Sequence, residues 1–431
     1  MKLQAVSKQK YKYSNTTTAI GKTAVCLSAV VILCKILGFA EKIIVANFFG
    51  TDDKADVYFA SMTIILSLFF LVKELVYPAV LPVFAKALKI SPKASSALFK
   101  KLFWGLFTAL IIILIGLVTF SDAVSSVLVP GFSTQKQELT SSVLKLLAPG
   151  CLFLGMSTLT YSVLNCRKNF FKAALPQAGF KLLIAAGLLS LLPVIGLNAV
   201  GITFTIAACC LFISQLSLIP EKNGLFNSAE PDANCDTNKV LKLMAPLAIG
   251  VFFSHISGLV DNALASTLAT GDLSCLGYAK KLTDAVVLIG PVALVTVVYS
   301  QLSHLALQPG LSEFKKLFTK TIRLIIFLSI PCAVLLVILR VPIVEVLFER
   351  GRFTTASTAG TSKAFLIYAF GVVTFSIESV IVYSFYALSN TKTPVLAGVF
   401  GVLLDIALAL CFVKPFGLAA IAWAFVISKT V

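Results

Sequence analysis

Charged side chains interrupt two of the most apolar stretches of this sequence. Lys35, Glu41 and Lys42 fall within the first long apolar segment, and Lys73 and Glu74 fall within the second. A charged side chain near the middle of a bilayer costs about 2.5–3.5 kcal/mol even on permissive insertion scales. We therefore interpret the three lysines as a surface for an anionic ligand, with the two glutamates as their partners.

Helical spacing places part of this set on one face. Lys35, Gly38 and Lys42 are separated by three and four residues, so they fall on one stripe of an α-helix, whereas Glu41 lies about 100° away from Lys42. The stripe predicts a cationic helix face that lines a water-filled cavity. Gly38 permits close packing or a bend beside it, and we take it as a candidate hinge.

The composition indicates where such helices reside. Of 431 residues, 58% are hydrophobic and 13% are charged, whereas soluble proteins have about 45–50% apolar and about 25% charged residues. Repeated apolar runs of about 20 residues predict an all-α polytopic membrane protein. About twelve transmembrane helices are expected, over residues 20–48, 57–84, 103–120, 141–164, 174–195, 198–219, 241–268, 275–303, 318–339, 362–388, 394–413 and 416–431.

The net charge of +17 would suggest nucleic acid as a partner of a soluble protein. Here the Lys and Arg residues between the expected spans concentrate on the side that holds the N-terminus. This asymmetry predicts that both termini are cytoplasmic, and no nucleic acid partner is expected. The ten cysteines are scattered, and His255 and His304 have no ligand spacing, so we expect no metal site. The first span lacks a cleavage site and is expected to be retained.

Similar strings recur in order along the chain at an offset of about 220 residues. The matched pairs are Gly38 with Gly258, Glu41 with Asp261, Tyr58 with Tyr278, Tyr161 with Tyr383, and Gly196 with Gly417. An internal duplication of six spans predicts two parallel repeats around a central cavity, which is typical of an alternating-access transporter. The expected organisation is a cytoplasmic tail (1–17), an N-terminal six-helix bundle (18–225), a cytoplasmic linker (226–238) and a C-terminal six-helix bundle (239–431).

The second half adds further charges to the candidate set. Lys281 joins the cationic surface, and Gly258 is the second candidate hinge. Asp261 and Asp405 stand among apolar residues on different expected helices, which favours a coupling site for a sodium ion or a proton over simple salt bridges. Lys73 is equally consistent with a side chain that extends to the membrane interface.

Several longer strings resemble a known family over nearly the whole chain, from about Leu27 to its end. They are Lys35-Ile-Leu-Gly-Phe39, Phe49-Gly50, Ala55-Asp56, Tyr278-Ala-Lys-Lys-Leu282, Leu347-Phe-Glu-Arg-Gly-Arg-Phe-Thr354 and Phe385-Tyr-Ala-Leu-Ser-Asn-Thr-Lys-Thr-Pro394. They are similar to the signatures of the MurJ/MviN family, the lipid II flippases of the multidrug/oligosaccharidyl-lipid/polysaccharide exporter superfamily.

The resemblance implies translocation of the undecaprenyl-pyrophosphate-linked peptidoglycan precursor between leaflets, for cell wall synthesis. It implies a basic cavity in which Lys35 and Lys281 take the places of two family arginines. It also implies that Asp261 and Asp405 match acids proposed to bind sodium. The expected setting is the bacterial cytoplasmic membrane, with a lipid-linked glycan as substrate and no organic cofactor. We expect a monomer in contact with membrane lipids, working beside the cell wall synthesis machinery.

The chain departs from the family pattern in the order of one charged pair, in a second-helix arginine, and in its twelve expected spans where the family commonly has fourteen. Glu41 and Lys42 exchange the family's order of cation and acid, and Phe69 falls where a second-helix arginine is expected. A flippase for another polyprenyl-linked saccharide (O-antigen or exopolysaccharide type) is therefore an alternative. A cation-coupled MATE-like exporter and a non-transporting scaffold are further ones. An enzyme is the least favoured class, because no nucleophile–base or metal constellation is evident.

Overall fold

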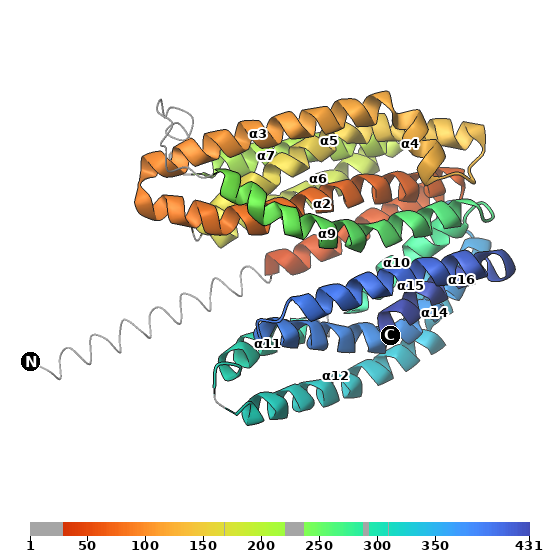
Figure 1. Ribbon diagram of the computed structural model, residues 1–431. Coiled ribbons are helices and arrows are strands. Elements are labelled where there is room, and N and C mark those ends of the chain that lie inside the picture. Colours follow the sequence, from red (N-terminus) through yellow and green to blue (C-terminus); the bar gives the residue numbers. More distant parts are fainter. Residues whose placement is uncertain (1–28, 168, 220–236, 288–292, 309) are drawn as a thin grey trace, which may run out of the picture.

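A computed structural model of the chain describes residues 29–431 apart from 168, 220–236, 288–292 and 309. The described part is helical and contains no strand (Figure 1). A helix over residues 29–49 comes first. It is followed by α2 (Asp53–Ile90), α3 (Pro92–Thr119), α4 (Ser121–Leu128), α5 (Thr134–Cys166), α6 (Phe170–Ile195), α7 (Asn198–Ser217), α9 (Thr237–Ser266), α10 (Asp272–Val287), α11 (Ala293–Leu305), α12 (Ser312–Ile338), α13 (Arg340–Phe348), α14 (Thr355–Ala387), α15 (Lys392–Phe416) and α16 (Leu418–Thr430).

Eight of the described helices are long and apolar enough to cross a membrane. The helix over 29–49, α9, α16 and the pair α10 and α11 stand at the remaining places of the predicted order, so the polytopic α-helical class is confirmed. The predicted eighth span covers α10 and α11, and residues 288–292 between them lie outside the described residues. The predicted tail (1–17) and residues 226–236 of the predicted linker lie outside the described residues.

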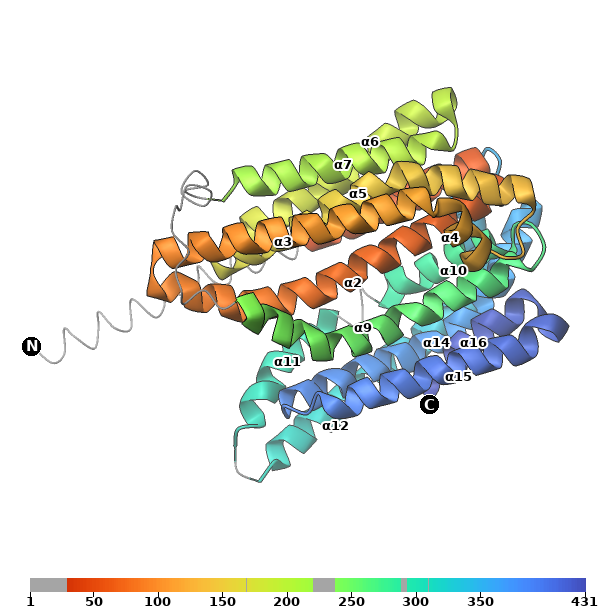
Figure 2. The same cartoon turned by 45° about the horizontal axis from the view of Figure 1, so that its top comes forward.

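The helices form two groups that lie one above the other (Figures 1 and 2). Helices α2 to α7 belong to one group, and α10 to α16 belong to the other. Helix α9 runs between them, because it packs along α2 of the first group and α15 of the second. The space between the groups is therefore bordered by α2 and α9, and those helices carry several of the predicted site residues.

The order of elements repeats along the chain. A short helix, α4 or α13, follows the third long element of each half. Gly196 and Gly417, which the sequence matched to each other, both have a positive φ (59° and 55°) directly after α6 and α15. Such φ values favour glycine, since it lacks a Cβ. The two halves thus make the same turn at corresponding positions.

Aromatic pairs repeat in the same way. The rings of Tyr77 and Tyr161 join α2 to α5 with centroids 5.6 Å apart. The rings of Tyr299 and Tyr383 join α11 to α14 with centroids 5.3 Å apart. Both residues of the first pair lie 222 positions before their counterparts. The packing between helices therefore follows the duplication, in addition to the sequence strings.

The lysine-rich connection after α2 is almost entirely helical. Helix α2 continues to Ile90 and α3 begins at Pro92, so Ser91 alone separates them. The Ser91 hydroxyl accepts a hydrogen bond from the Ala94 N–H at 3.0 Å, and Pro92 occupies the first helical position. Both features stabilise a helix start, which explains why α3 begins here.

Helices α5 and α7 pack closely within the first half, whereas α3 is mostly exposed. Gly201 of α7 faces Leu146 of α5, and a Cβ on Gly201 would overlap the Leu146 side chain. The absence of a side chain at this position therefore sets how close these two helices can approach.

We expect Gly201→Ala to destabilise the protein by roughly 1–3 kcal/mol, because the added methyl group forces α5 and α7 apart. The control is Gly116→Ala on α3, where no atom lies within 4 Å of an added Cβ. It should leave the stability unchanged or slightly increased. Thermal unfolding in detergent measures both variants, and equal Tm values for the two would contradict the packing described here.

Candidate functional site

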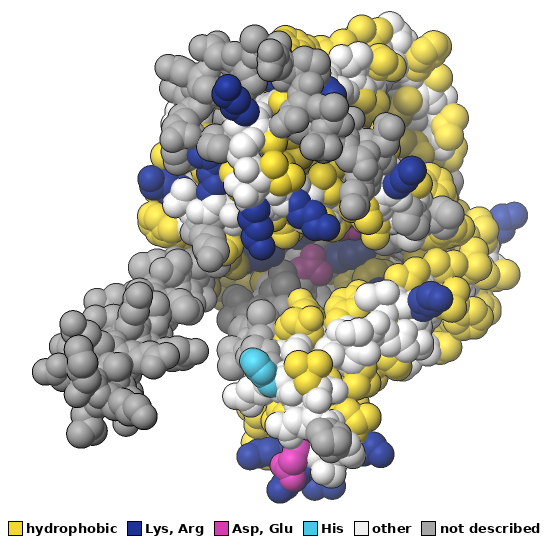
Figure 3. Space-filling view, turned by 60° about the vertical axis from the view of Figure 1, so that its left-hand side comes forward, with side chains coloured by type: hydrophobic (Ala, Val, Ile, Leu, Met, Phe, Trp, Pro, Cys, Tyr) yellow, Lys and Arg dark blue, Asp and Glu magenta, His cyan; other side chains and the backbone are white. Residues whose placement is uncertain are grey.

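Charged side chains line a hollow between the two groups of helices. Figure 3 looks at the end of the molecule where α2 turns into α3, and it shows Lys or Arg and Asp or Glu side chains inside the hollow. We refer to this as the open end. The opposite end, where residues 50–52, 131–133, 267–271 and 349–354 meet, is called the closed end.

Glu41 is the centre of the charged group on the first helix. Its Oε1 atom accepts hydrogen bonds from Lys42 Nζ at 3.0 Å and from the Tyr58 hydroxyl at 2.5 Å. Its Oε2 atom lies 3.3 Å from Lys181 Nζ. The three partners come from the helix over 29–49, from α2 and from α6. One carboxylate thus joins three helices of the first half, and we call Glu41, Lys42, Tyr58 and Lys181 the Glu41 cluster.

Lys42 is enclosed within this cluster. Its side chain is only 8% exposed, its ammonium also contacts the Tyr58 hydroxyl, and it lies 4.6 Å from the centroid of the Tyr58 ring and 5.6 Å from that of Phe59. A buried charge requires a partner and hydrogen bonds to offset its lost hydration. The exchanged order of Glu41 and Lys42 therefore still yields a satisfied ion pair.

Lys35 and Lys281 approach the same region from different halves. Lys35 of the first helix is within electrostatic range of Lys281 of α10 and of Lys181. Lys281 is also within electrostatic range of Lys42, and the Lys281 ammonium lies 3.4 Å from Asp284 Oδ2. Both lysines are partly solvent-exposed. The structure thus brings together the cations that the sequence predicted to bind an anion.

Glu74, the acid predicted in the second apolar segment, forms a contact between the two halves. The Glu74 carboxylate of α2 lies 3.4 Å from His255 Nε2 of α9, and the His255 ring stacks on Phe70 with centroids 5.8 Å apart. Lys73 lies 5.6 Å from the Phe70 centroid and within electrostatic range of Lys35. Lys73 therefore extends the cationic surface, whereas Glu74 contacts α9.

Asp261 and Asp405 meet in the second half. They are within electrostatic range of each other and of the Lys280 ammonium, which lies 4.0 Å from the centroid of the Phe425 ring. The Ser257 hydroxyl donates to Asp405 Oδ2. Oδ1 of each aspartate is buried without a hydrogen-bond partner. Buried carboxylate oxygens without partners are costly, so this pair can accept a cation or a proton.

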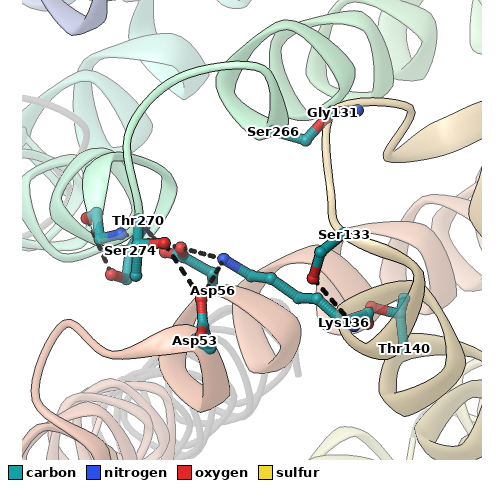
Figure 4. A network of polar contacts seen from close by, with 10 residues as sticks. Asp53, Asp56, Gly131, Ser133, Lys136, Thr140, Ser266, Thr270 and Ser274 are labelled. Carbon is teal, nitrogen blue, oxygen red and sulfur yellow. Dashed lines mark hydrogen bonds and ion pairs between the residues drawn. The ribbon is translucent and has the colours of Figure 1, made fainter.

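The closed end depends on Asp56 at the start of α2. Its Oδ2 atom accepts a bond from Lys136 Nζ at 2.7 Å and from the Gly271 N–H at 2.9 Å, and its Oδ1 atom accepts from the Ser274 N–H at 2.9 Å (Figure 4). Gly271 and Ser274 belong to the start of α10 in the other half. A carboxylate at a helix N-terminus satisfies free N–H groups and interacts favourably with the helix dipole.

Further contacts cross between the halves at this end. The Tyr278 hydroxyl donates to the Gly50 carbonyl at 3.1 Å, and the Arg352 N–H donates to the Asn47 carbonyl at 2.9 Å. Gly351 adopts φ 57° here, and a Cβ on it would overlap the Asn47 carbonyl oxygen. These backbone approaches hold the two halves against each other at the closed end.

Asp56, Lys136 and Lys181 belong to these networks but were not among the sequence candidates. Lys181 is a lone charge within an apolar span, so the criterion that selected Lys35 would also have found it. Asp56 and Lys136 carried no such signal, because both lie near expected span ends. Gly38 and Gly258 lie inside continuous helices, so their role as hinges stays a prediction.

Residues 45–431 match the family model described as "Lipid II flippase MurJ". A relative named "Probable lipid II flippase MurJ" from Buchnera aphidicola subsp. Schizaphis graminum is 27% identical over 86% of this chain and 74% of its own length. A solved structure of lipid II flippase MurJ in an inward closed conformation has 24% identity and a TM-score of 0.83, over 94% of this chain and 85% of the other. An inward-facing MATE family transporter, at 10% identity, has a TM-score of 0.81 and covers 94% of each chain.

We expect Asp56→Ala to open the closed end. It removes bonds that join α2 to α10, and a bond to a charged group contributes about 1.5–3 kcal/mol, so the ratio of open to closed molecules should rise by about tenfold or more. Distances between spin labels on α4 and α13 measure the two populations. Glu313→Ala on α12, whose exposed carboxylate lies 3.9 Å from Lys316 Nζ, is the control. Identical distance distributions for all three proteins would refute this role of Asp56.

Proposed function

The chain belongs to the MurJ family of lipid II flippases, and from this membership we propose how it works. It moves lipid II, the undecaprenyl-pyrophosphate-linked peptidoglycan precursor, from the inner to the outer leaflet of the bacterial cytoplasmic membrane by alternating access. The observation that carries the proposal is the group of cations between the halves, contributed by Lys35 and the Glu41 cluster on one side and by Lys281 on the other. A diphosphate is the anionic part of this substrate, and ammonium groups bind phosphate oxygens through charge-assisted hydrogen bonds.

The charge distribution supports an orientation in the membrane. The open end carries many lysines, at the α2–α3 turn and at the start of α12, whereas the loops of the closed end carry few. The positive-inside rule therefore favours the open end in the cytoplasm, with both termini on that side. In this orientation the hollow faces the leaflet in which the lipid-linked precursor would be collected.

Transport then requires that the two halves rock against each other. Residues 1–225 and 238–431 are the proposed moving units. The contacts at the closed end, chiefly those of Asp56, break in the outward-facing state, while the open end closes. The Glu41 cluster lies entirely within the first half, so it moves with that half as a unit. The bound diphosphate is thereby exposed to the outside.

The pair of aspartates in the second half supports ion coupling. Asp261 and Asp405 together with Lys280 form a group with a formal charge of −1, and unpartnered oxygens point to room for one more positive charge. A sodium ion or a proton would neutralise the group and favour one arrangement of α9 against α15. Binding of this cation would reset the cycle after the lipid has been released.

A flippase for another polyprenyl-linked saccharide is the second candidate. The observation in its favour is the exchange at Glu41 and Lys42, together with Phe69 in place of a basic residue. The diphosphate chemistry would be the same, and the sugars would differ. A MATE-like exporter of cationic drugs fits less well, because the hollow gathers lysines, which repel cations.

The proposed working unit is a monomer surrounded by membrane lipids. The exposed surfaces of α3, α6, α12 and α15 carry many large apolar side chains, which suits contact with acyl chains. Contact with the cell wall synthesis machinery follows from the proposed role in supplying precursor at the outer leaflet.

We expect this gene to restore growth to bacterial cells depleted of their own lipid II flippase. Lys281→Ala should abolish rescue at equal membrane abundance, because it removes a cation from the second half, whereas Lys281→Arg should retain it. Lys316→Ala, on the exposed start of α12, is the matched control. Failure of the unaltered gene to restore growth, or full rescue by Lys281→Ala, would count against the proposal.

Transport by the unaltered protein in proteoliposomes should increase about threefold or more with either a sodium or a proton gradient. The double variant Asp261→Asn/Asp405→Asn should respond to neither, because it cannot supply the negative charge that binds the cation. Glu378→Gln, which alters a carboxylate paired with Lys429 at the surface of the same half, should respond normally. If both gradients leave the unaltered protein's rate unchanged, ion coupling at this pair is rejected.

A further inference from the structure

Lys181 is a cation of α6 that reaches the first helix of the chain. Its ammonium lies 3.3 Å from Glu41 Oε2 and 5.4 Å from the centroid of the neighbouring Phe180 ring. Its Cε atom would be 3.9 Å from a Cβ on Gly38, so the side chain passes over the helix where that helix has no side chain. The aliphatic part of Lys181 therefore lies beside Gly38, between Lys35 and Lys42 in the sequence.

Lys181 is held much less firmly than Lys42. The Lys181 side chain is 32% exposed, and its ammonium forms an ion pair with Glu41. Lys42 is 8% exposed and contacts Glu41, the Tyr58 hydroxyl and two aromatic rings. An arriving anion can therefore reach Lys181 without removing a charge from a buried site. Removing Lys42 from its partners would leave Glu41 without its closest cation.

Glu41 can release Lys181 and keep its other bonds. Its Oε1 atom holds Lys42 and Tyr58, whereas its Oε2 atom faces Lys181. A phosphate group carries more negative charge than one carboxylate and offers several acceptor oxygens, so it competes well for an exposed ammonium. Once the phosphate leaves, the same carboxylate recaptures the lysine.

We infer that Lys181 is a ligand for the diphosphate group of the substrate and that it exchanges between Glu41 and that group. The inference rests on the proposed function and extends it, since it names one ligand residue and a preference for diphosphate over monophosphate. Lys35, Lys181 and Lys281 come from three helices, and Lys181 and Lys281 each lie within electrostatic range of Lys35. Three separately anchored cations suit the spread charge of a diphosphate better than a monophosphate.

The test uses the full chain in detergent, with farnesyl diphosphate and farnesyl monophosphate as probes and calorimetry as the measurement. Lys181→Met should weaken diphosphate binding about tenfold, and it should weaken monophosphate binding less than about threefold. Lys181→Arg should restore diphosphate binding, because the charge returns. Lys172→Met, which alters an exposed lysine of the same helix, should bind both probes as the unaltered protein does.

Unchanged diphosphate binding by Lys181→Met would overturn the inference, as would an equal loss for both probes that Lys181→Arg does not restore. If Lys181→Met does not fold, the acetylation rates of Lys181 and Lys172 in the unaltered protein decide instead. Farnesyl diphosphate should slow the acetylation of Lys181 and leave that of Lys172 unchanged. An equal effect of the probe on the two lysines would reject the inference.

Neither probe carries a sugar or a peptide, so the outcome is separate from the identity of the glycan. Diphosphate binding that depends on Lys181, in a protein that does not transport lipid II, would reject the proposed function and keep this inference. Lipid II transport together with diphosphate binding that does not depend on Lys181 would keep the proposed function and reject this inference.

Discussion

A single buried carboxylate makes it possible for several lysines to occupy the space between the halves. Charges placed in a membrane interior are costly unless they are paired, and like charges close together repel each other. Glu41 provides the negative charge that lies between Lys42 and Lys181, and the Tyr58 hydroxyl satisfies it further. Because these partners come from three helices, the carboxylate also fixes how those helices are arranged. The cationic surface therefore depends on an acid at its centre.

The same part of α2 supports the closed end. Asp56, which binds the start of α10, lies less than one helical turn from Tyr58. The neighbouring Phe59 ring packs edge-on against Tyr278 with centroids 4.7 Å apart. Opening of the closed end therefore separates α10 from the segment of α2 whose Tyr58 hydroxyl bonds Glu41. This arrangement couples the charges that bind an anion to the contacts that separate the two sides of the membrane.

The sequence predicted the helical class, the duplication and most of the cations, because apolar length, string order and isolated charges are visible in one dimension. It could not show which charges pair. Glu41 and Glu74 looked equivalent, yet one lies within a buried cluster and the other contacts His255 on α9. The sequence showed Asp56 only as part of a family string, because two of its partners are backbone N–H groups more than 200 residues away. Lys181 was visible as a lone charge, but its contact with Glu41 depends on helix packing.

The most direct test of the account is the accessibility of the lipid II head group in proteoliposomes. Lipid II is placed in the inner leaflet, and a reagent that acts only from outside modifies head groups as they arrive. The account predicts modification that grows with time when the unaltered protein is present and that falls to the protein-free level with Lys281→Ala. Modification at the protein-free level with the unaltered protein, while another polyprenyl-linked saccharide is translocated, would contradict the assignment of lipid II as the substrate.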